Sequence, residues 1–303
     1  MTIKRIVIVY LLCSYLFSNY FDSSIGKCSI VINNKDKSYL LDYQTLIQKE
    51  TQKLVDTFGE VKKEPFEIII PKTRKEFYNL AKTAPEWGIA ITKSKENKII
   101  IQPASISNIS KNRFNEILIH ELNHLYLHRL INNVPMPSWF VEGLAMKFSK
   151  EFSFLHKIEI SKAIWKNTLI PLDGLKNFNT KNKFQIKLAY AQAAAAVNSL
   201  EYYNNKNILY EIIDLLKKEN NFWESIYQLT GEDKFDFQEK YEIYITNYFL
   251  WIFLLNASNI LFVLFPFILI IGYWIKRNKN ITILKKWEIE EQLLETEKND
   301  LLK

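Results

Sequence analysis

HELNHLYLH, residues 120–128, contains three of the four histidines in a chain of 303 residues. Within it, His120, Glu121 and His124 form the pattern H-E-x-x-H. Residues four apart on a helix lie on the same face, so two imidazoles at this spacing can bind one metal ion. The glutamate between them can then reach the water that attacks a substrate. The stretch therefore predicts a helix that carries a zinc hydrolase site.

A catalytic zinc site needs a third protein ligand and one open position. The candidate is Glu142, which follows the motif helix expected over residues 112–131 and a turn that contains two prolines. Ser138 is the expected N-cap of the next helix. Because the turn lets that helix return antiparallel, the carboxylate of Glu142 can face the two imidazoles. Gly143 beside it would permit a close approach between helices.

Hydrophobic spacing predicts the elements on both sides of the motif. A helix is expected over residues 38–58, and strands are expected over 67–70, 89–92 and 98–102. Two or three strands therefore precede the motif, and the chain after it is mostly helical. The strand over 98–102 is a candidate sheet edge, where an extended peptide could add as a further strand.

Charge and cysteine content exclude several classes of protein. The net charge of +7 comes from 40 basic and 33 acidic residues, and the basic residues are scattered along the chain. This pattern argues against a nucleic-acid-binding protein. The two cysteines, Cys13 and Cys28, are too few for a disulfide framework and lack the spacing of metal ligands.

Both ends of the chain have membrane character. Residues 1–28 begin with MTIKR and an apolar run of about a dozen residues, which is typical of a signal peptide or a short N-terminal anchor. Ser24 and Gly26 form a weak small-x-small cleavage pattern. Residues 248–275 contain no charged residue and are long enough for a transmembrane helix.

The charges around these segments predict an orientation. Residues 276–303 follow the apolar run and begin with the basic stretch KRNKN, which marks a cytoplasmic tail. Residues 29–247 are then a domain outside the cytoplasm, anchored in the cell membrane by a single C-terminal span.

The motif and the sequence after it resemble a known family. HELNHLYLH followed by PSWFVEGLA (residues 137–145) is similar to the peptidase MA-like group of gluzincin zinc metallopeptidases, which combine H-E-x-x-H with W-x-x-E-G-x-A. The helical segments AYAQAAAAV (residues 189–197) and LTGEDKFDFQEKYEIYI (residues 229–245) are also similar to that group. The resemblance covers roughly residues 60–246.

The resemblance implies an α+β, zincin-like metallopeptidase domain, in which a small β-sheet is followed by a mainly helical part. It also implies zinc as the cofactor, peptide or protein substrates, and Glu121 as general base. Gluzincins commonly use a tyrosine hydroxyl to stabilise the oxyanion, and Tyr190 is the candidate here, with Gln192 as a weaker one. Thermolysin-like members carry an aspartate where this chain has Met146, so the partner that orients the histidines is not identified by the resemblance.

Three classes of function remain open. The first is a membrane-anchored zinc peptidase, either an endopeptidase or an aminopeptidase. The second is a catalytically inactive relative that keeps the fold as a binding or assembly module at the membrane. The third is an integral membrane protein with an incidental motif. Substrate, cleavage preference, protein partners and oligomeric state do not follow from the sequence.

Overall fold

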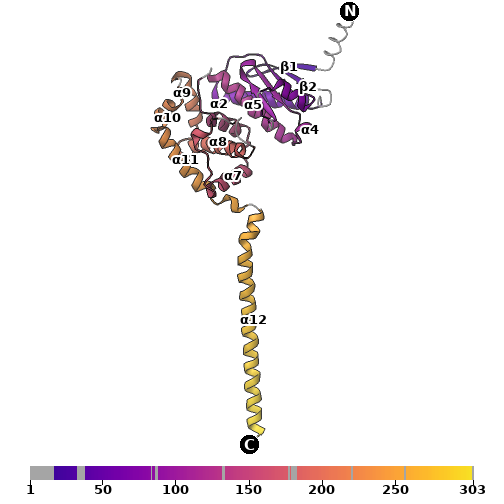
Figure 1. The fold of residues 1–303 in the computed structure, drawn as a ribbon, viewed down its shortest axis with the longest axis vertical. Coiled ribbons are helices and arrows are strands. Elements are labelled where there is room, and N and C mark those ends of the chain that lie inside the picture. Colours follow the sequence, from indigo (N-terminus) through magenta and orange to yellow (C-terminus); the bar gives the residue numbers. More distant parts are fainter. Residues whose placement is uncertain are drawn as a thin grey trace, which may run out of the picture. The chain divides into compact units, whose positions relative to one another are not determined.

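The chain contains two compact units. The computed structural model describes residues 17–32, 38–82, 84–85, 88–131, 134–176, 178, 183–219, 221–255 and 257–301. Residues 1–250 form the first unit and residues 251–303 form the second (Figure 1).

The first unit begins with a five-stranded mixed sheet. Its strands are β1 (Phe17–Ser23), β2 (Gly26–Ile32), β3 (Phe66–Ile69), β4 (Ala90–Lys93) and β5 (Lys98–Ile101). The spatial order is β1-β2-β3-β5-β4. The central strands β2, β3 and β5 are parallel, whereas β1 and β4 pair antiparallel with their neighbours. The two antiparallel strands therefore form the two edges of the described sheet.

This sheet differs from the expected one in two respects. It has five strands rather than two or three, because residues 17–32 form a β-hairpin that extends the sheet. Residues 17–28 of that hairpin fall in the segment expected to be a signal peptide or anchor, and residues 1–16 of the segment lie outside the described residues. The strand at 98–102 was wrongly expected at an edge, since β5 pairs with β3 on one side and β4 on the other.

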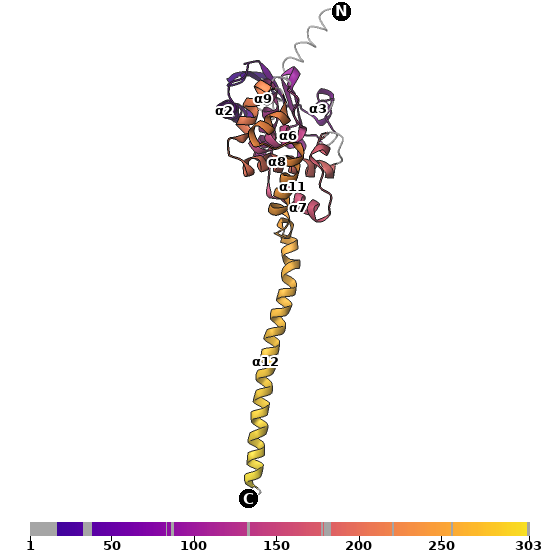
Figure 2. The ribbon, with the colours of Figure 1, turned by 90° about the vertical axis from the view of Figure 1, so that its left-hand side faces the viewer.

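Helices make up the rest of the first unit. They are α2 (Leu40–Phe58), α3 (Arg74–Leu80), α4 (Ala104–Ser107), α5 (Lys111–Ile131), α6 (Ser138–Phe148), α7 (Phe154–Trp165), α8 (Lys183–Tyr203), α9 (Ile208–Glu219), α10 (Phe222–Thr230) and α11 (Lys234–Phe249). The small sheet followed by a mainly helical part is the predicted α+β architecture. Figure 2 shows the helical body from the left-hand side of Figure 1.

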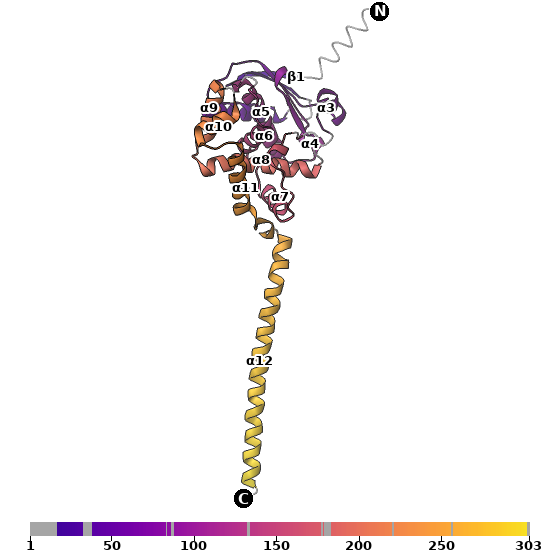
Figure 3. The same cartoon turned by 60° about the vertical axis from the view of Figure 1, so that its left-hand side comes forward.

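The two faces of the sheet carry different helices. On one face, α3 packs its Phe77 and Ala81 against Ile100, with Ile91 of β4 beside them. Successive strand residues point to opposite faces, so Ile99 and Ile101 face the other side, where α5 packs on β4 and β5. Figure 3 shows α3 and α5 on opposite sides of the strands. The motif helix α5 therefore packs directly on the face of the sheet opposite α3.

Helix α5 is also fixed from the side by α2. The rings of Tyr43 and Phe114 lie 4.9 Å apart between the two helices. The Tyr126 hydroxyl donates a hydrogen bond of 2.5 Å to the carbonyl of Gly59, which ends α2 with a φ of 98°. A positive φ is favourable for glycine because it has no Cβ. These contacts hold both ends of the motif helix.

At Gly143, helix α6 lies so close to α8 that no side chain fits between them. A Cβ added at Gly143 would lie 2.3 Å from the Ala193 carbonyl oxygen and 2.5 Å from a methyl group of Val197. The close approach expected at this glycine is therefore made to α8. Ser138 begins α6 but does not cap it, because its hydroxyl donates to the carbonyl of Lys176 at 2.8 Å.

The second unit contains a short 3₁₀ segment (Ile252–Leu255) and α12 (Ala257–Leu301). Residues 260–294 of α12 are long and apolar enough to cross a membrane by length and composition. Pro266 lies inside this helix. The apolar run expected as one span from residue 248 is divided, because α11 continues to Phe249 and α12 begins at Ala257.

Candidate metal centre

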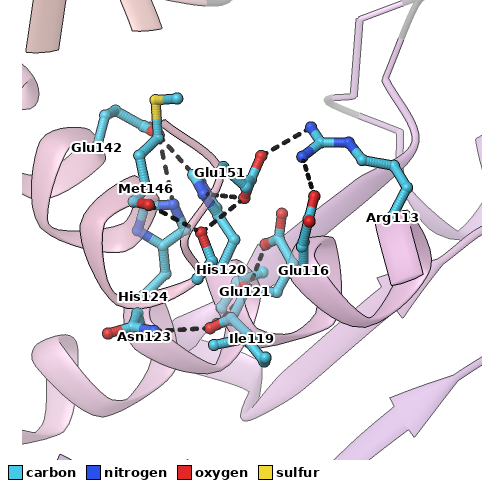
Figure 4. Close-up of polar contacts among 12 residues, drawn as sticks. Arg113, Glu116, Ile119, His120, Glu121, Asn123, His124, Glu142, Met146 and Glu151 are labelled. Carbon is cyan, nitrogen blue, oxygen red and sulfur yellow. Dashed lines mark hydrogen bonds and ion pairs between the residues drawn. The ribbon is translucent and has the colours of Figure 1, made fainter. Parts of the chain in front are cut away.

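Helices α5 and α6 bring together the three predicted metal ligands. His120 and His124 lie one turn apart on α5, and their rings are 4.7 Å apart between centroids. From α6, Oε2 of Glu142 lies 3.3 Å from Nε2 of His120 and 3.5 Å from Nε2 of His124. Figure 4 shows the carboxylate of Glu142 directed at both imidazoles.

The donor set fits a zinc ion in both chemistry and spacing. Two imidazole nitrogens and one carboxylate oxygen are a known ligand combination for catalytic zinc. Ligand bonds of ~2.0–2.1 Å in a tetrahedron put neighbouring donor atoms about 3.4 Å apart. The two measured distances to Glu142 are close to this value, and all three donor atoms lie within 4.8 Å of one another. Within the described residues, this is the group of ligand-type side chains that meets such a spacing.

The charges of the site compensate one another. Burial alone would lower the pKa of His120, but the carboxylates of Glu142 and Glu151 raise it well above its usual value. Burial alone would raise the pKa of Glu142, but His124 and His120 lower it strongly. Glu142 is therefore an anion at neutral pH, and the carboxylates of Glu142 and Glu151 stabilise positive charge at His120.

Glu151 is a site residue that the sequence analysis missed. Its Oε1 lies 2.9 Å from Nδ1 of His120, at ion-pair distance, although the ring N–H is not well aligned with the oxygen. The Ser149 hydroxyl donates to the same carboxylate at 2.9 Å. Burial raises the pKa of Glu151, but His120 and Arg113 outweigh it and lower the pKa to about 2. A carboxylate on the second ring nitrogen fixes the tautomer and orientation of a histidine ligand.

Glu151 is itself held by Arg113 near the start of α5. The guanidinium of Arg113 lies 2.7 Å from Glu151 and 2.9 Å from Glu116. Burial lowers the pKa of Arg113, but Glu151 and then Glu116 raise it above its usual value. Figure 4 shows the resulting line of contacts from Arg113 through Glu151 to His120 and Glu142. Met146, where thermolysin-like proteins carry an aspartate, is instead buried in the core.

The expected general base is buried beside the sheet edge. Glu121 is 8% exposed, and the Thr92 hydroxyl of β4 lies 2.6 Å from its Oε2. The strand that contains Thr92 was predicted from the sequence, but no functional role was predicted for Thr92 itself. No local spacing links the two positions, since 29 residues separate them along the chain.

Tyr190 of α8 lies next to the candidate metal ligand His120. Its ring centroid is 6.1 Å from that of His120 and 4.9 Å from that of Phe178. Burial, followed by the charge of Glu142, raises the pKa of Tyr190 well above its usual value, so its hydroxyl keeps its proton at neutral pH. Gln192, the weaker candidate, is fully buried, and its side-chain amide bonds both the N–H and the carbonyl of Ile170.

Comparison of the sequence with protein families finds a match over most of the chain. A sequence model of the peptidase MA superfamily matches residues 46–247, a region that contains all three candidate ligands. Comparison with curated proteins gives no match.

Solved structures with a similar fold include two peptidases. An M1 zinc metallopeptidase from Deinococcus radiodurans is 10% identical and has a TM-score of 0.46, with 76% of this chain and 52% of that chain covered. An aminopeptidase N family protein from Idiomarina loihiensis is 13% identical and has a TM-score of 0.49, with 75% and 46% covered. The present chain therefore spans about half the length of the structures it matches.

Proposed function

The chain belongs to the peptidase MA superfamily, and we propose that it is a membrane-anchored zinc metallopeptidase that hydrolyses peptide bonds. The observation that best supports this proposal is the triplet His120, His124 and Glu142, whose donor atoms lie within 4.8 Å of one another. His120 and His124 are the two histidines of the H-E-x-x-H motif on α5, and Glu142, the proposed third ligand, lies on the next helix, α6.

In the proposed reaction, the three side chains would hold one zinc ion with a position open to solvent or substrate. A zinc ion so held polarises the scissile carbonyl and lowers the pKa of the attacking water toward ~7. Glu121 accepts the proton of that water and passes it to the leaving amine. Tyr190, whose hydroxyl remains protonated, donates a hydrogen bond to the oxyanion of the tetrahedral intermediate.

The edge strand β4 is the proposed site for the substrate backbone. Among the described strands β4 pairs only with β5, so its outer edge has free backbone donors and acceptors. An extended peptide that adds to this edge would be held by main-chain hydrogen bonds and would require little sequence specificity. The same strand carries Thr92, which contacts Glu121. Endopeptidase and aminopeptidase action are both compatible with this arrangement.

Helix α12 is the proposed membrane anchor. The uncharged part of α12, up to Ile275, is followed by KRNKN at residues 276–280. Positive residues favour the cytoplasmic side of a membrane span. The domain with the metal centre would then face outward from the cell membrane. A signal peptide or anchor at the N-terminus is consistent with this orientation.

The decisive test compares zinc content with peptide hydrolysis. The full chain is purified in detergent, and its bound zinc and its cleavage of a library of free and N-terminally blocked peptides are measured. Glu121→Gln should retain about one zinc but lose about 10²- to 10⁴-fold in kcat, because it removes only the general base. Glu142→Ala should lose zinc and activity together. Glu239→Gln, an exposed residue of α11, is the control for the same chemical change.

Two outcomes would contradict the proposal. Equal cleavage by Glu121→Gln and the parent protein would exclude the mechanism even if zinc is bound. A parent protein that binds zinc but cleaves neither the free nor the N-terminally blocked peptides would favour the alternative, an inactive relative that serves as a binding or assembly module.

A further inference from the structure

Thr92 makes a contact with Glu121 that the reaction scheme leaves without a role. Its Oγ1 lies 2.6 Å from Oε2 of Glu121 and 3.0 Å from the main-chain carbonyl oxygen of the same residue. A threonine hydroxyl has one proton and therefore donates to one of these two oxygens at a time. The carboxylate oxygen is the closer acceptor and is charged, which makes it the stronger partner.

Thr92 lies on a face of the sheet where an apolar residue would stabilise the fold better than threonine does. Its neighbour Ile91 joins the apolar cluster around Phe77 on the α3 face, so Thr92 points to the opposite face, toward α5. On that face Ile99 and Ile101 of the adjacent strand are fully buried. Valine has the shape of threonine and would suit such a face better, unless the hydroxyl has a partner.

We propose that Thr92 is a positioning residue that fixes the carboxylate of Glu121 for proton transfer. One carboxylate oxygen accepts the Thr92 hydroxyl, and the other remains available for the proton of the attacking water. A glutamate side chain that is free to rotate loses conformational entropy when it is fixed. The hydrogen bond fixes the rotamer before the substrate arrives, so this loss does not add to the reaction barrier.

The contact also connects the general base to the proposed substrate strand. Thr92 lies on β4, and the main chain of β4 is the edge proposed to pair with the peptide. A peptide that is bound in register on β4 is therefore positioned relative to the same strand that positions Glu121. This inference rests on the proposed peptidase function and assigns a residue within it.

The test uses two variants of the full chain. Thr92→Val keeps the shape and removes the hydroxyl, whereas Thr92→Ser keeps the hydroxyl. A misplaced catalytic group costs up to ~10²-fold in rate, so Thr92→Val should lower kcat by about 10- to 100-fold. KM should change little, because the base acts in the transition state. Thr92→Ser should restore kcat to within about 3-fold of the parent protein.

Three further measurements separate positioning from general damage. Zinc content should be unchanged in Thr92→Val. In a Glu121→Gln background, Thr92→Val should have no further effect on kcat, because the base is already absent. In a Glu121→Leu background, Thr92→Val should lower the midpoint of thermal unfolding by less than in the parent protein, because only the hydrogen bond to the main-chain carbonyl of residue 121 is lost. In the parent background, the same substitution should lower that midpoint.

The possible failures are distinguishable. An active parent protein with an unchanged kcat in Thr92→Val overturns this inference alone. Loss of zinc in Thr92→Val also overturns it in favour of a structural role. So does a kcat of Thr92→Ser that is as low as that of Thr92→Val. A parent protein that binds zinc and cleaves no peptide overturns the proposed function, and this inference with it.

Discussion

Helices α5 and α12 depart from the usual distribution of polar and apolar residues in opposite directions. Helix α5 is largely buried and yet includes His120, Glu121 and Asn123 among its buried residues. From residue 260 to residue 294 the side chains of α12 are exposed, and yet they include Phe262 and Ile270. Buried polar groups and large exposed apolar surfaces are both unfavourable unless something compensates them. Each helix suits a partner that the polypeptide does not supply: the partner proposed for α5 is a cation, and the partner proposed for α12 is lipid.

The two helices also differ in how much the chain itself compensates. Around α5, Glu142 and Glu151 contact opposite nitrogens of His120, and Arg113 neutralises Glu151. Glu121 has Thr92. On α12, the apolar side chains from residue 260 to residue 294 stay exposed, and the helix belongs to a separate compact unit of the chain. The site on α5 should therefore persist without α12.

The largest expected effect comes from removing α12. A chain that stops after Leu250 should move from the membrane fraction almost entirely to the soluble fraction, because it lacks the ~20 apolar residues of a membrane span. It should also retain about one zinc per chain. Cell fractionation with alkaline washing and zinc analysis measure both. A chain that stops after Lys286, which keeps the apolar part, is the control and should stay in the membrane.

A truncated chain that remains in the membrane would break the comparison. It would mean that the first unit carries an anchor of its own, and the apolar run of sequence that precedes β1 is the candidate. Soluble protein without zinc would instead show that the site on α5 depends on the second unit.

The next effect contrasts two glycines, one near each helix. Gly143 has no space for a Cβ between α6 and α8, whereas Gly272 of α12 has nothing within 4 Å. Gly143→Ala should destabilise the first unit by ~1–3 kcal/mol, as overpacking does. That corresponds to roughly 2–4 °C in Tm per kcal/mol for a domain of this size. Gly272→Ala should change Tm little, since surface changes usually stay within ±0.5 kcal/mol.

Thermal unfolding of the full chain in detergent measures this contrast. Zinc affinity should fall along with Tm in Gly143→Ala, because Glu142 is the adjacent residue and moves with α6. Equal Tm values for the two alanine variants would show that α6 can move away from α8 at no cost.

The smallest expected effect concerns the compensation around His120. Glu151→Gln keeps the size of the side chain but removes the negative charge beside Nδ1 of His120. Zinc affinity should fall by about 10- to 100-fold, the usual effect of losing such a partner. Glu116→Gln is the matched control, since it removes the other carboxylate on Arg113 and leaves the contact between Glu151 and His120. Competition with a chelator measures both affinities, and an equal loss would assign the effect to Arg113.

The grouping of the candidate ligands could be predicted from the sequence because its geometry is local. His120 and His124 are one helical turn apart, and Glu142 lies on the next helix after a short turn. Glu151 could not be predicted in this way. It returns to His120 because Lys150 adopts a left-handed φ of 61° after α6 ends, and nothing in a lysine indicates that conformation. Thr92 was missed for a related reason, since its contact depends on the packing of β4 on α5.

The strands show a similar limit. The apolar runs that became β3, β4 and β5 were recognised within a residue or two of their bounds. β1 and β2 were missed because an apolar run near an N-terminus is also what a signal peptide or anchor requires. The edge position was assigned to β5 from chain order alone. Chain order does not determine spatial order in a sheet, because β4 pairs antiparallel with β5 and takes the outer position.

The hairpin of β1 and β2 limits how the chain can be processed. Ser24 and Gly26, which resemble a cleavage pattern, lie at the turn that joins the two strands, and Arg129 of α5 donates to the Ile25 carbonyl in that turn at 2.7 Å. Proteolytic removal of the segment up to Gly26 would strip β1 from the sheet and leave β2 with an open edge. Such an edge is a template for pairing with other chains. Removal of the segment up to Gly26 and an intact sheet therefore exclude each other, and a folded chain with five strands must keep residues 17–23.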